Sequence, residues 1–386
     1  MSLPSALAGA VLILMAAFFV GFLGSRRAPV SLVPGRYDAI DGLRGLLALF
    51  VVMHHSCLWY MYIKTGHWGF PGVPKLFVYL GPASVSVFFM ITALLFTGKL
   101  LAANDDTPVD WARLYIGRVL RVVPLYYMVC MVMFVVVFAI MGVHTHIALR
   151  SQLSSLLRWM FFLGDPDING FVHTSLIVAG VTWSLTYEWI FYFSLPLVAV
   201  ALRKKVPTVI IAPAVGAIVL IKLLFRVRIM QVAAFSGGFL AIYCTKNPRI
   251  VRILRSNVSS VAMLVFIVAW ILKAPMPVSR YFALLLSLPF ACVACGNSLW
   301  GILTHRAVRW LGDVSYGIYL IHGICLYLLW TRVVGLKAAA ELSQSVFWLI
   351  VTGAVMGIVA LAGVSHKYLE MPALARTRSI QAKLGM

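Results

Sequence analysis

Acidic residues are scarce in this chain of 386 residues, which has 11 Asp and Glu against 32 Lys and Arg. Only 11% of its residues are charged, whereas about one-quarter are charged in an ordinary soluble domain. That shortage excludes the common class of soluble globular proteins. Hydrophobic residues make up 62% and aromatic residues 13%, which excludes a disordered or collagen-like chain. Long apolar runs between basic stretches indicate a polytopic membrane protein.

The chain also lacks internal repeats, Gly/Ser-rich or Pro-rich linkers, and any separate polar domain. A transmembrane helix needs about 20 mainly apolar residues, and reading for such runs gives eleven segments. They are 5–23, 40–62, 76–97, 121–142, 174–200, 207–224, 229–244, 257–273, 281–299, 314–335 and 345–366. We therefore expect one membrane domain of the all-α class, a polytopic bundle of transmembrane helices. The longest polar connection, 143–173, carries a turn signal at 165–170.

The formal net charge of +21 raises the possibility of a nucleic-acid partner. The basic residues are instead distributed among the connections between apolar runs, so we expect contact with membrane lipid and no nucleic acid. Of the 32 Lys and Arg, 20 fall on one side of the membrane, 11 on the other, and Arg44 inside a span. The richer side is expected to be cytoplasmic. This places the C-terminus in the cytoplasm and the N-terminus in the periplasm.

The first segment, 5–23, is either a retained anchor or a signal sequence. It has no basic residues before its apolar run and no A-x-A-like cleavage site, which favours the anchor. The six cysteines lie in apolar stretches, where a thiol acts as a small hydrophobic group. Cys292 and Cys295 have C-x-x-C spacing, but no second pair with metal-ligand spacing accompanies them. We expect a buried helix there and no metal.

Ionisable side chains within a span are costly and are functional candidates by default. In the second segment, Asp41, Arg44 and His55 fall on one helix face, and His55 lies about 16 Å above Arg44. Asp41 is one turn before Arg44 and is expected to pair with it. The structural alternatives are an Arg44 side chain that extends to the lipid headgroups and a His55 satisfied by an interior hydrogen bond.

Three further places carry polar side chains near or within spans. Glu188 follows Trp183 in the fifth segment; it either forms a packing salt bridge, with Arg44 for example, or orients a catalytic histidine. Arg118 and Arg121 are one turn apart before the fourth span. They suit a polyanionic phosphate ligand, although positive-inside anchoring also explains them.

The tenth segment carries Ser315, Tyr319 and His322 at i, i+4 and i+7, again on one helix face. His322 has two possible roles. It takes part in the chemistry, or it is a buried histidine bonded to a neighbouring helix.

Taken in order, several blocks make the sequence resemble the membrane-bound acyltransferase-3 family of bacterial envelope acyltransferases. They are Asp41-Gly42-Leu43-Arg44-Gly45 with His55, Val85-Ser86-Val87-Phe88-Phe89-Met90, Arg118 to Arg121 with Pro124 and Tyr126, Trp183-Ser184-Leu185 to Glu188 with Phe191-Tyr192, and Leu311-Gly312-Asp313-Val314-Ser315-Tyr316 to His322 with Tyr368-Leu369-Glu370-Met371-Pro372. They extend over about 36–375. The family often has a second carboxylate after the residue that corresponds to Glu188, where Trp189 stands here. A Ser-Gly pair is common where this chain has Thr92-Ala93.

The resemblance implies ten core helices, so the segment 5–23 is an addition in front of them. The expected organisation is an extra helix and basic connector at 1–35, the acyltransferase domain at 36–375, and a basic cytoplasmic tail at 376–386. With 16 residues after Glu370, an appended esterase-like domain is not expected.

The resemblance further implies transfer of an acyl group, usually acetyl, from cytoplasmic acyl-CoA to a hydroxyl of an exported glycan at a bacterial inner membrane. Arg118 and Arg121 would hold the CoA phosphates. The thioester would reach inward along the Arg44–His55 face, and His55 would act as general base or carry the acyl group. Glu188 would orient His55 or offset the charge of Arg44, with Asp41, Trp183, Ser315, Tyr319 and His322 in support. A transporter or flippase of a lipid-linked sugar, an acyltransferase for a small lipid or secondary metabolite, and a structural scaffold are the alternatives.

Overall fold

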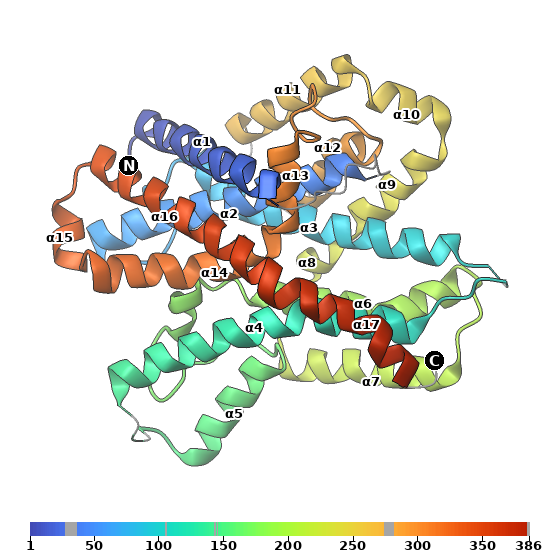
Figure 1. Cartoon of the computed structure of the whole chain (residues 1–386), viewed down its shortest axis with the longest axis horizontal. Helices are drawn as coiled ribbons and strands as arrows, with labels where there is room; N and C mark the ends of the chain where they lie inside the picture. Colours follow the sequence, from blue (N-terminus) through green and yellow to red (C-terminus); the bar gives the residue numbers. More distant parts are fainter. Residues whose placement is uncertain (28–36, 105, 143, 145, 274–281, 384–386) are drawn as a thin grey trace. The chain divides into compact units, whose positions relative to one another are not determined.

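The computed structural model describes residues 1–27, 37–104, 106–142, 144, 146–273 and 282–383, without the side chains of 230 and 378–383. Apart from one isolated bridge between Ile168 and Phe171, the described residues form helices, turns and loops without a β-strand (Figure 1). The predicted all-α class is confirmed. The basic connector at 28–36 and the last three residues of the tail, 384–386, lie outside the described residues.

The chain divides into two compact units, and the division falls within two of its long helices. The first unit comprises 1–94 and 230–363, and the second comprises 95–229 and 364–386. The helices shared between them by sequence are α3 (Lys75–Ala102) and α16 (Gln344–Ser365).

The first unit is organised around one deeply buried helix. Its further elements are α1 (Leu3–Arg27), α2 (Asp38–Thr65), α9 (Ser236–Lys246), α10 (Pro248–Leu254), α11 (Asn257–Lys273), α12 (Phe282–Ala294), α13 (Arg306–Asp313), α14 (Ser315–Leu328), the π-helical turn η2 (Leu329–Val333) and α15 (Leu336–Glu341). In its most apolar window α2 is 78% buried, whereas α1 is 28% buried. Because α2 also carries the predicted polar stripe, that stripe lies in the protein interior. Both α13 and α14 pack against α2 (Figure 1).

Two glycines allow α13 to approach α2 closely. A Cβ atom at Gly42 would collide with the carbonyl oxygen of Leu303, and one at Gly312 would collide with the carbonyl oxygen of Asp41. The missing side chains therefore bring the start of α2 directly against the end of α13 and against the turn that precedes α13. This contact places the Asp41–Arg44 turn beside the start of α14.

The N-terminal helix α1 packs on the first unit through its small residues. The ring of Trp348 on α16 occupies the place of a side chain at Gly9, and the ring of Trp310 does so at Gly24. Arg306 donates a hydrogen bond to the carbonyl oxygen of Ser25, which ties α1 to the start of α13. The segment predicted at 5–23 is thus a helix with specific partners.

The second unit contains the end of α3 and five further α-helices. They are α4 (Trp111–Met141), α5 (Leu149–Met160), α6 (Trp183–Ala201), α7 (Thr208–Leu224) and α17 (Met371–Lys383), with the 3-10 turn η1 (Thr174–Val178) and the π-helical turn η3 (His366–Glu370). By contacts, α17 packs on α4, and α7 packs on α6. The short helix α8 (Ile229–Ala233) spans the division between the units.

Among the described residues, six helices are long and apolar enough to cross a membrane, or eight if each of two bent pairs counts as one span. The bent pairs are α10 with α11 and α13 with α14, and α7 and α12 are shorter apolar helices. The apolar runs thus mark helices, but several predicted spans were too long. The helix in the run 281–299, for example, ends at Ala294. The run 174–200 becomes α-helical only at Trp183, because the 3-10 turn Thr174–Val178 is flanked by left-handed backbone conformations at His173 and Ala179. The run 229–244 is interrupted after Ala233.

Candidate functional site

The centre of the first unit holds a pair of buried histidines. His55 on α2 is 9% exposed, and His322 on α14 is fully buried. The Nδ1 atom of His55 lies 3.1 Å from the Nε2 atom of His322. The two residues are far apart in the sequence, and the packing of α14 on α2 brings them together.

Each of these histidines also contacts a backbone carbonyl one turn earlier in its own helix. The Nδ1 atom of His55 lies 3.0 Å from the carbonyl oxygen of Val51. The Nδ1 atom of His322 lies 3.1 Å from the carbonyl oxygen of Ile318. These contacts hold both rings in defined orientations, which is the first requirement for a group that transfers protons.

Two tryptophan rings, those of Trp68 and Trp59, lie beside His55 toward the end of α2. The Trp68 ring is nearly parallel to the His55 ring, with 13° between the planes and 6.4 Å between centroids. Trp59, one turn after His55, packs edge-on against Trp68 at 5.4 Å. Trp68 is 36% exposed, whereas Trp59 is fully buried. The histidine pair is therefore closed off by α2 and α14 and bordered by one ring that reaches the surface.

His54 has a different role from its neighbour. Its Nδ1 atom lies 2.7 Å from the carbonyl oxygen of Phe77 on α3. A Cβ atom at Gly81 would lie 2.6 Å from the His54 ring, so the ring fills the space beside that glycine. His54 thus joins α2 to α3 through this hydrogen bond and its packing against Gly81, and we assign it a structural role.

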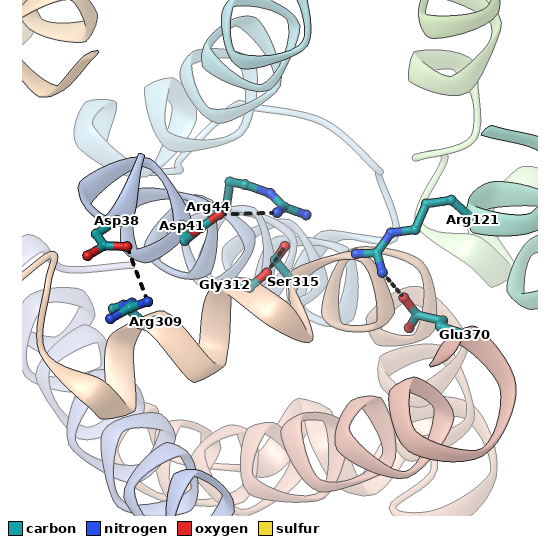
Figure 2. A network of polar contacts seen from close by, with 8 residues as sticks. All are labelled: Asp38, Asp41, Arg44, Arg121, Arg309, Gly312, Ser315 and Glu370. Atoms are coloured by element: carbon teal, nitrogen blue, oxygen red, sulfur yellow. Dashed lines mark hydrogen bonds and ion pairs between the residues drawn. The ribbon is translucent and has the colours of Figure 1, made fainter. Parts of the chain in front are cut away.

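The N-terminal end of α2 carries two ion pairs. Arg44 lies 3.7 Å from Asp41, which confirms the predicted pairing (Figure 2). Arg309 on α13 lies 3.2 Å from Asp38 (Figure 2). His55 lies eleven positions after Arg44 on one continuous helix, a rise of about 16 Å. Arg44 thus belongs to the entrance of this helix, far from the histidine pair.

Ser315 and Tyr319 lie on α14 in the same row as His322. The Ser315 hydroxyl donates a hydrogen bond of 2.7 Å to the carbonyl oxygen of Gly312, at the bend between α13 and α14 (Figure 2). The Tyr319 ring lies between those of Phe88 on α3 and His322, with centroids 6.2 Å from each. The three side chains are buried as expected. The hydrogen bond of Ser315 stabilises the bend between α13 and α14.

In the second unit, the two predicted phosphate-binding arginines have different partners. Arg121 on α4 pairs with Glu370 of η3 at 2.9 Å, and the Glu370 side chain is 1% exposed (Figure 2). Arg118 instead lies over the Phe96 ring, 5.0 Å from its centroid. Within the described part of the chain, Arg121 thus pairs with a carboxylate, whereas Arg118 contacts an aromatic ring.

Arg118 belongs to a cluster formed by the end of α3, the start of α4 and α6. Lys99 also lies over the Phe96 ring, at 5.2 Å from its centroid. The Tyr192 hydroxyl accepts a hydrogen bond from Arg118 and donates one of 3.1 Å to Glu188. This arrangement places two cations on one ring and links one of them to the embedded carboxylate.

Trp183 begins α6 and packs edge-on against Tyr187 at 5.7 Å. Glu188 and Trp183 belong to the second unit, whereas His55 and Arg44 belong to the first. Orientation of His55 by Glu188 therefore stays a prediction, as do the catalytic roles of the individual residues. The cysteines at 292 and 295 are buried free thiols, and Cys292 lies in helix α12.

Sequence reasoning did not identify Glu370 as a partner of Arg121, nor Lys99, Phe96 and Trp68 as neighbours of the predicted site residues. Lys99 was counted only among the topology-setting charges. Its position at the end of an apolar run, shortly before the Arg118 segment, was the one sequence feature that could have indicated a place beside Arg118. Nothing in the spacing indicates that Glu370 meets Arg121.

Comparison with known proteins places the chain in a family. Residues 37–365 match the model of the acyltransferase 3 family, described as an acyltransferase domain. The chain belongs to this family and is a multi-pass membrane protein.

The chain is also similar to the "Putative peptidoglycan O-acetyltransferase YrhL" of Bacillus subtilis (strain 168), with 24% identity over 381 residues. That alignment covers 88% of this chain and 54% of the relative, so the chain spans about half the length of the protein it matches. No solved structure gives a significant match.

Proposed function

We propose that the chain is a membrane O-acyltransferase that moves an acyl group, acetyl in the first instance, from acyl-CoA to a hydroxyl of an envelope glycan. Membership of the acyltransferase 3 family supports the reaction class. The name of the Bacillus subtilis relative supports acetyl as the group and a cell-wall polysaccharide as the acceptor class. The observation that carries the proposal is the His55–His322 contact of 3.1 Å inside a buried region of apolar helices.

His55 is the proposed general base. It takes the proton of the acceptor hydroxyl as the hydroxyl oxygen attacks the thioester carbonyl, which gives a tetrahedral intermediate. Collapse of the intermediate forms the ester and breaks the carbon–sulfur bond. The proton then passes from His55 to the leaving CoA thiolate, so the histidine is restored and the products are the acylated glycan and free CoA.

The cluster around Phe96 is the proposed donor site. Arg118 and Lys99 would contact the CoA phosphates, since both cations sit on the same ring and are held near each other. Arg121 is proposed to maintain the site through its pair with Glu370. This division refines the expectation that Arg118 and Arg121 bind phosphate together.

Trp68 and Trp59 are the proposed border of the acceptor site. The partly exposed ring of Trp68 offers an apolar face to a sugar ring beside His55. The buried Nε1–H group of Trp59 has no hydrogen-bond partner among the described residues. An acceptor hydroxyl is a suitable partner for that donor.

The proposed location is a bacterial inner membrane with the C-terminus in the cytoplasm, which rests on the 20-to-11 division of Lys and Arg. Reporter fusions at each end of the chain test this orientation. A cytoplasmic-type signal at the N-terminus would contradict the proposed periplasmic N-terminus.

Mass spectrometry of envelope glycans from a strain that lacks the gene tests the function and identifies both acyl group and acceptor. Re-expression of the natural chain should restore a lost acyl modification. His55→Ala should fail to restore it, whereas His144→Ala, a change at an exposed histidine, should succeed. An unchanged glycan profile in the deletion strain, combined with accumulation of a lipid-linked sugar, would favour the transporter alternative.

A further inference from the structure

We propose that His322 is a positioning residue that fixes the tautomer of His55, so that His55 carries its hydrogen on Nδ1 and presents an unprotonated Nε2 to the substrate. This inference deepens the proposed function and rests on it for the catalytic consequence. The tautomer itself follows from distances within the first unit.

The first step concerns His322. Its Nδ1 atom lies 3.1 Å from the carbonyl oxygen of Ile318. A carbonyl oxygen can only accept, so Nδ1 of His322 must carry the hydrogen of this bond. A neutral imidazole has one N–H group, which leaves Nε2 of His322 as an acceptor. The neutral form is expected because the side chain is fully buried between apolar helices.

The second step concerns His55, whose Nδ1 atom faces two acceptors. One is the Nε2 atom of His322 at 3.1 Å, and the other is the carbonyl oxygen of Val51 at 3.0 Å. With a hydrogen on Nδ1, both contacts are satisfied by one shared donor. Without it, the lone pair of Nδ1 would point toward the carbonyl oxygen of Val51, which is repulsive. The hydrogen of neutral His55 therefore belongs on Nδ1, and Nε2 is the free base.

The third step concerns the neighbouring histidine, which could in principle compete for the same atom. His54 meets His55 edge-on with ring centroids 4.9 Å apart. Its own Nδ1 atom lies 2.7 Å from the Phe77 carbonyl oxygen and donates there. His54 is therefore committed to α3, and His322 is the imidazole within hydrogen-bond distance of His55.

This geometry assigns each proton during transfer. Nε2 of His55 takes the proton of the acceptor hydroxyl and later returns it to the CoA thiolate. While His55 is an imidazolium, its Nδ1–H bond to Nε2 of His322 becomes a charge-assisted hydrogen bond. His322 neither gains nor loses a proton. It orients the base in the way that a carboxylate orients the histidine of a Ser-His-Asp triad, but as a neutral acceptor.

Nitrogen-15 NMR of the full-length protein in lipid nanodiscs, labelled at histidine, tests the tautomer directly and without substrate. Comparison with His55→Ala identifies the His55 signals. We expect a protonated Nδ1 and an unprotonated Nε2 at neutral pH. A His55 with its hydrogen on Nε2 would overturn the inference even if the protein transfers acyl groups. Conversely, the expected tautomer in a protein without acyltransferase activity would count against the proposed function alone.

Two variants test whether His322 is responsible. His322→Leu removes the acceptor; it should leave His55 in a mixture of tautomers and reduce kcat by tenfold or more, with KM for acyl-CoA little changed. His322→Gln keeps a side-chain oxygen near the position of Nε2 and should restore most of both readouts. Thermal unfolding shows whether His322→Leu is folded. If its unfolding midpoint equals that of the natural protein, the His55 tautomer and kcat decide whether His322 positions His55. An unchanged tautomer and kcat in a folded His322→Leu protein would overturn the positioning role.

Discussion

The Nε2 atom of His322 lies 3.1 Å from the Nδ1 atom of His55, and neither side chain is more than 9% exposed. Two helices that are far apart in the sequence thus present an oriented, buried pair of imidazoles. By contrast, Arg44 lies at the start of α2 in an ion pair with Asp41. The arginine and histidine of the sequence motif therefore have separate surroundings and are expected to have separate roles.

Arg118→Gln and Lys99→Gln should each raise KM for acyl-CoA several-fold and leave kcat nearly unchanged. Both changes remove a cation from the Phe96 ring in the second unit, whereas the histidine pair belongs to the first unit. Initial rates over a range of acyl-CoA concentrations provide the measurement, with Arg249→Gln, a change at an exposed cation, as control. A KM equal to that of the natural protein in both variants would return these residues to the role of topology anchors.

Glu370→Gln should destabilise the protein, because it leaves the guanidinium of Arg121 without its carboxylate in a largely buried place. Removing one partner of such a pair costs about 3 kcal/mol or more. The thermal unfolding midpoint in detergent should fall clearly, and it should stay unchanged in Glu341→Gln, where the acid is exposed. Equal midpoints for the two variants would show that the Arg121–Glu370 pair contributes no stability.

Trp68→Ala should raise KM for the glycan acceptor and leave KM for acyl-CoA unchanged, because Trp68 borders His55 at the surface end of α2. Trp68→Phe keeps an aromatic face and should retain most acceptor affinity. Kinetics with each substrate varied in turn separate the two constants. An effect on both substrates, or on neither, would argue against an acceptor site at this ring.

Gly312→Ala should lower the yield and the unfolding midpoint of the protein, because its methyl group would meet the Asp41 carbonyl oxygen and separate α13 from α2. The matched control is Gly353→Ala on α16, where a Cβ atom meets nothing within 4 Å. Alanine in that exposed helical place is expected to stabilise by about 0.5–1 kcal/mol. Thermal unfolding of both variants checks the contrast, and a harmless Gly312→Ala would contradict the close approach of the two helices.

Much of the fold follows from the sequence because the length of an apolar run is a direct physical requirement for a helix in a bilayer. The pairing of Asp41 with Arg44 was also predictable, since residues three apart meet on a helix surface. The break before Trp183 was not, because it depends on left-handed conformations at His173 and Ala179, which are not glycines. Tertiary context selects such conformations, and local propensity disfavours them.

The sequence predicted the residues of the site better than the contacts between them. His55 and His322 were both candidates from their place inside apolar spans, but their contact depends on the packing of α14 against α2. The Arg121–Glu370 pair likewise joins distant parts of one unit. Contacts of this kind have no periodic signal in a single sequence, so spacing alone grouped Arg121 with Arg118.

The most direct test of the central claim, acyl transfer centred on His55, uses the purified full-length protein in nanodiscs with acetyl-CoA labelled in its acetyl group and a cell-wall glycan acceptor. The natural protein should release CoA and label the glycan, and His144→Ala should do the same. His55→Ala should lose activity by about a hundredfold or more, as expected when a general base is removed. Equal labelling of the glycan by His55→Ala and the natural protein would contradict the account.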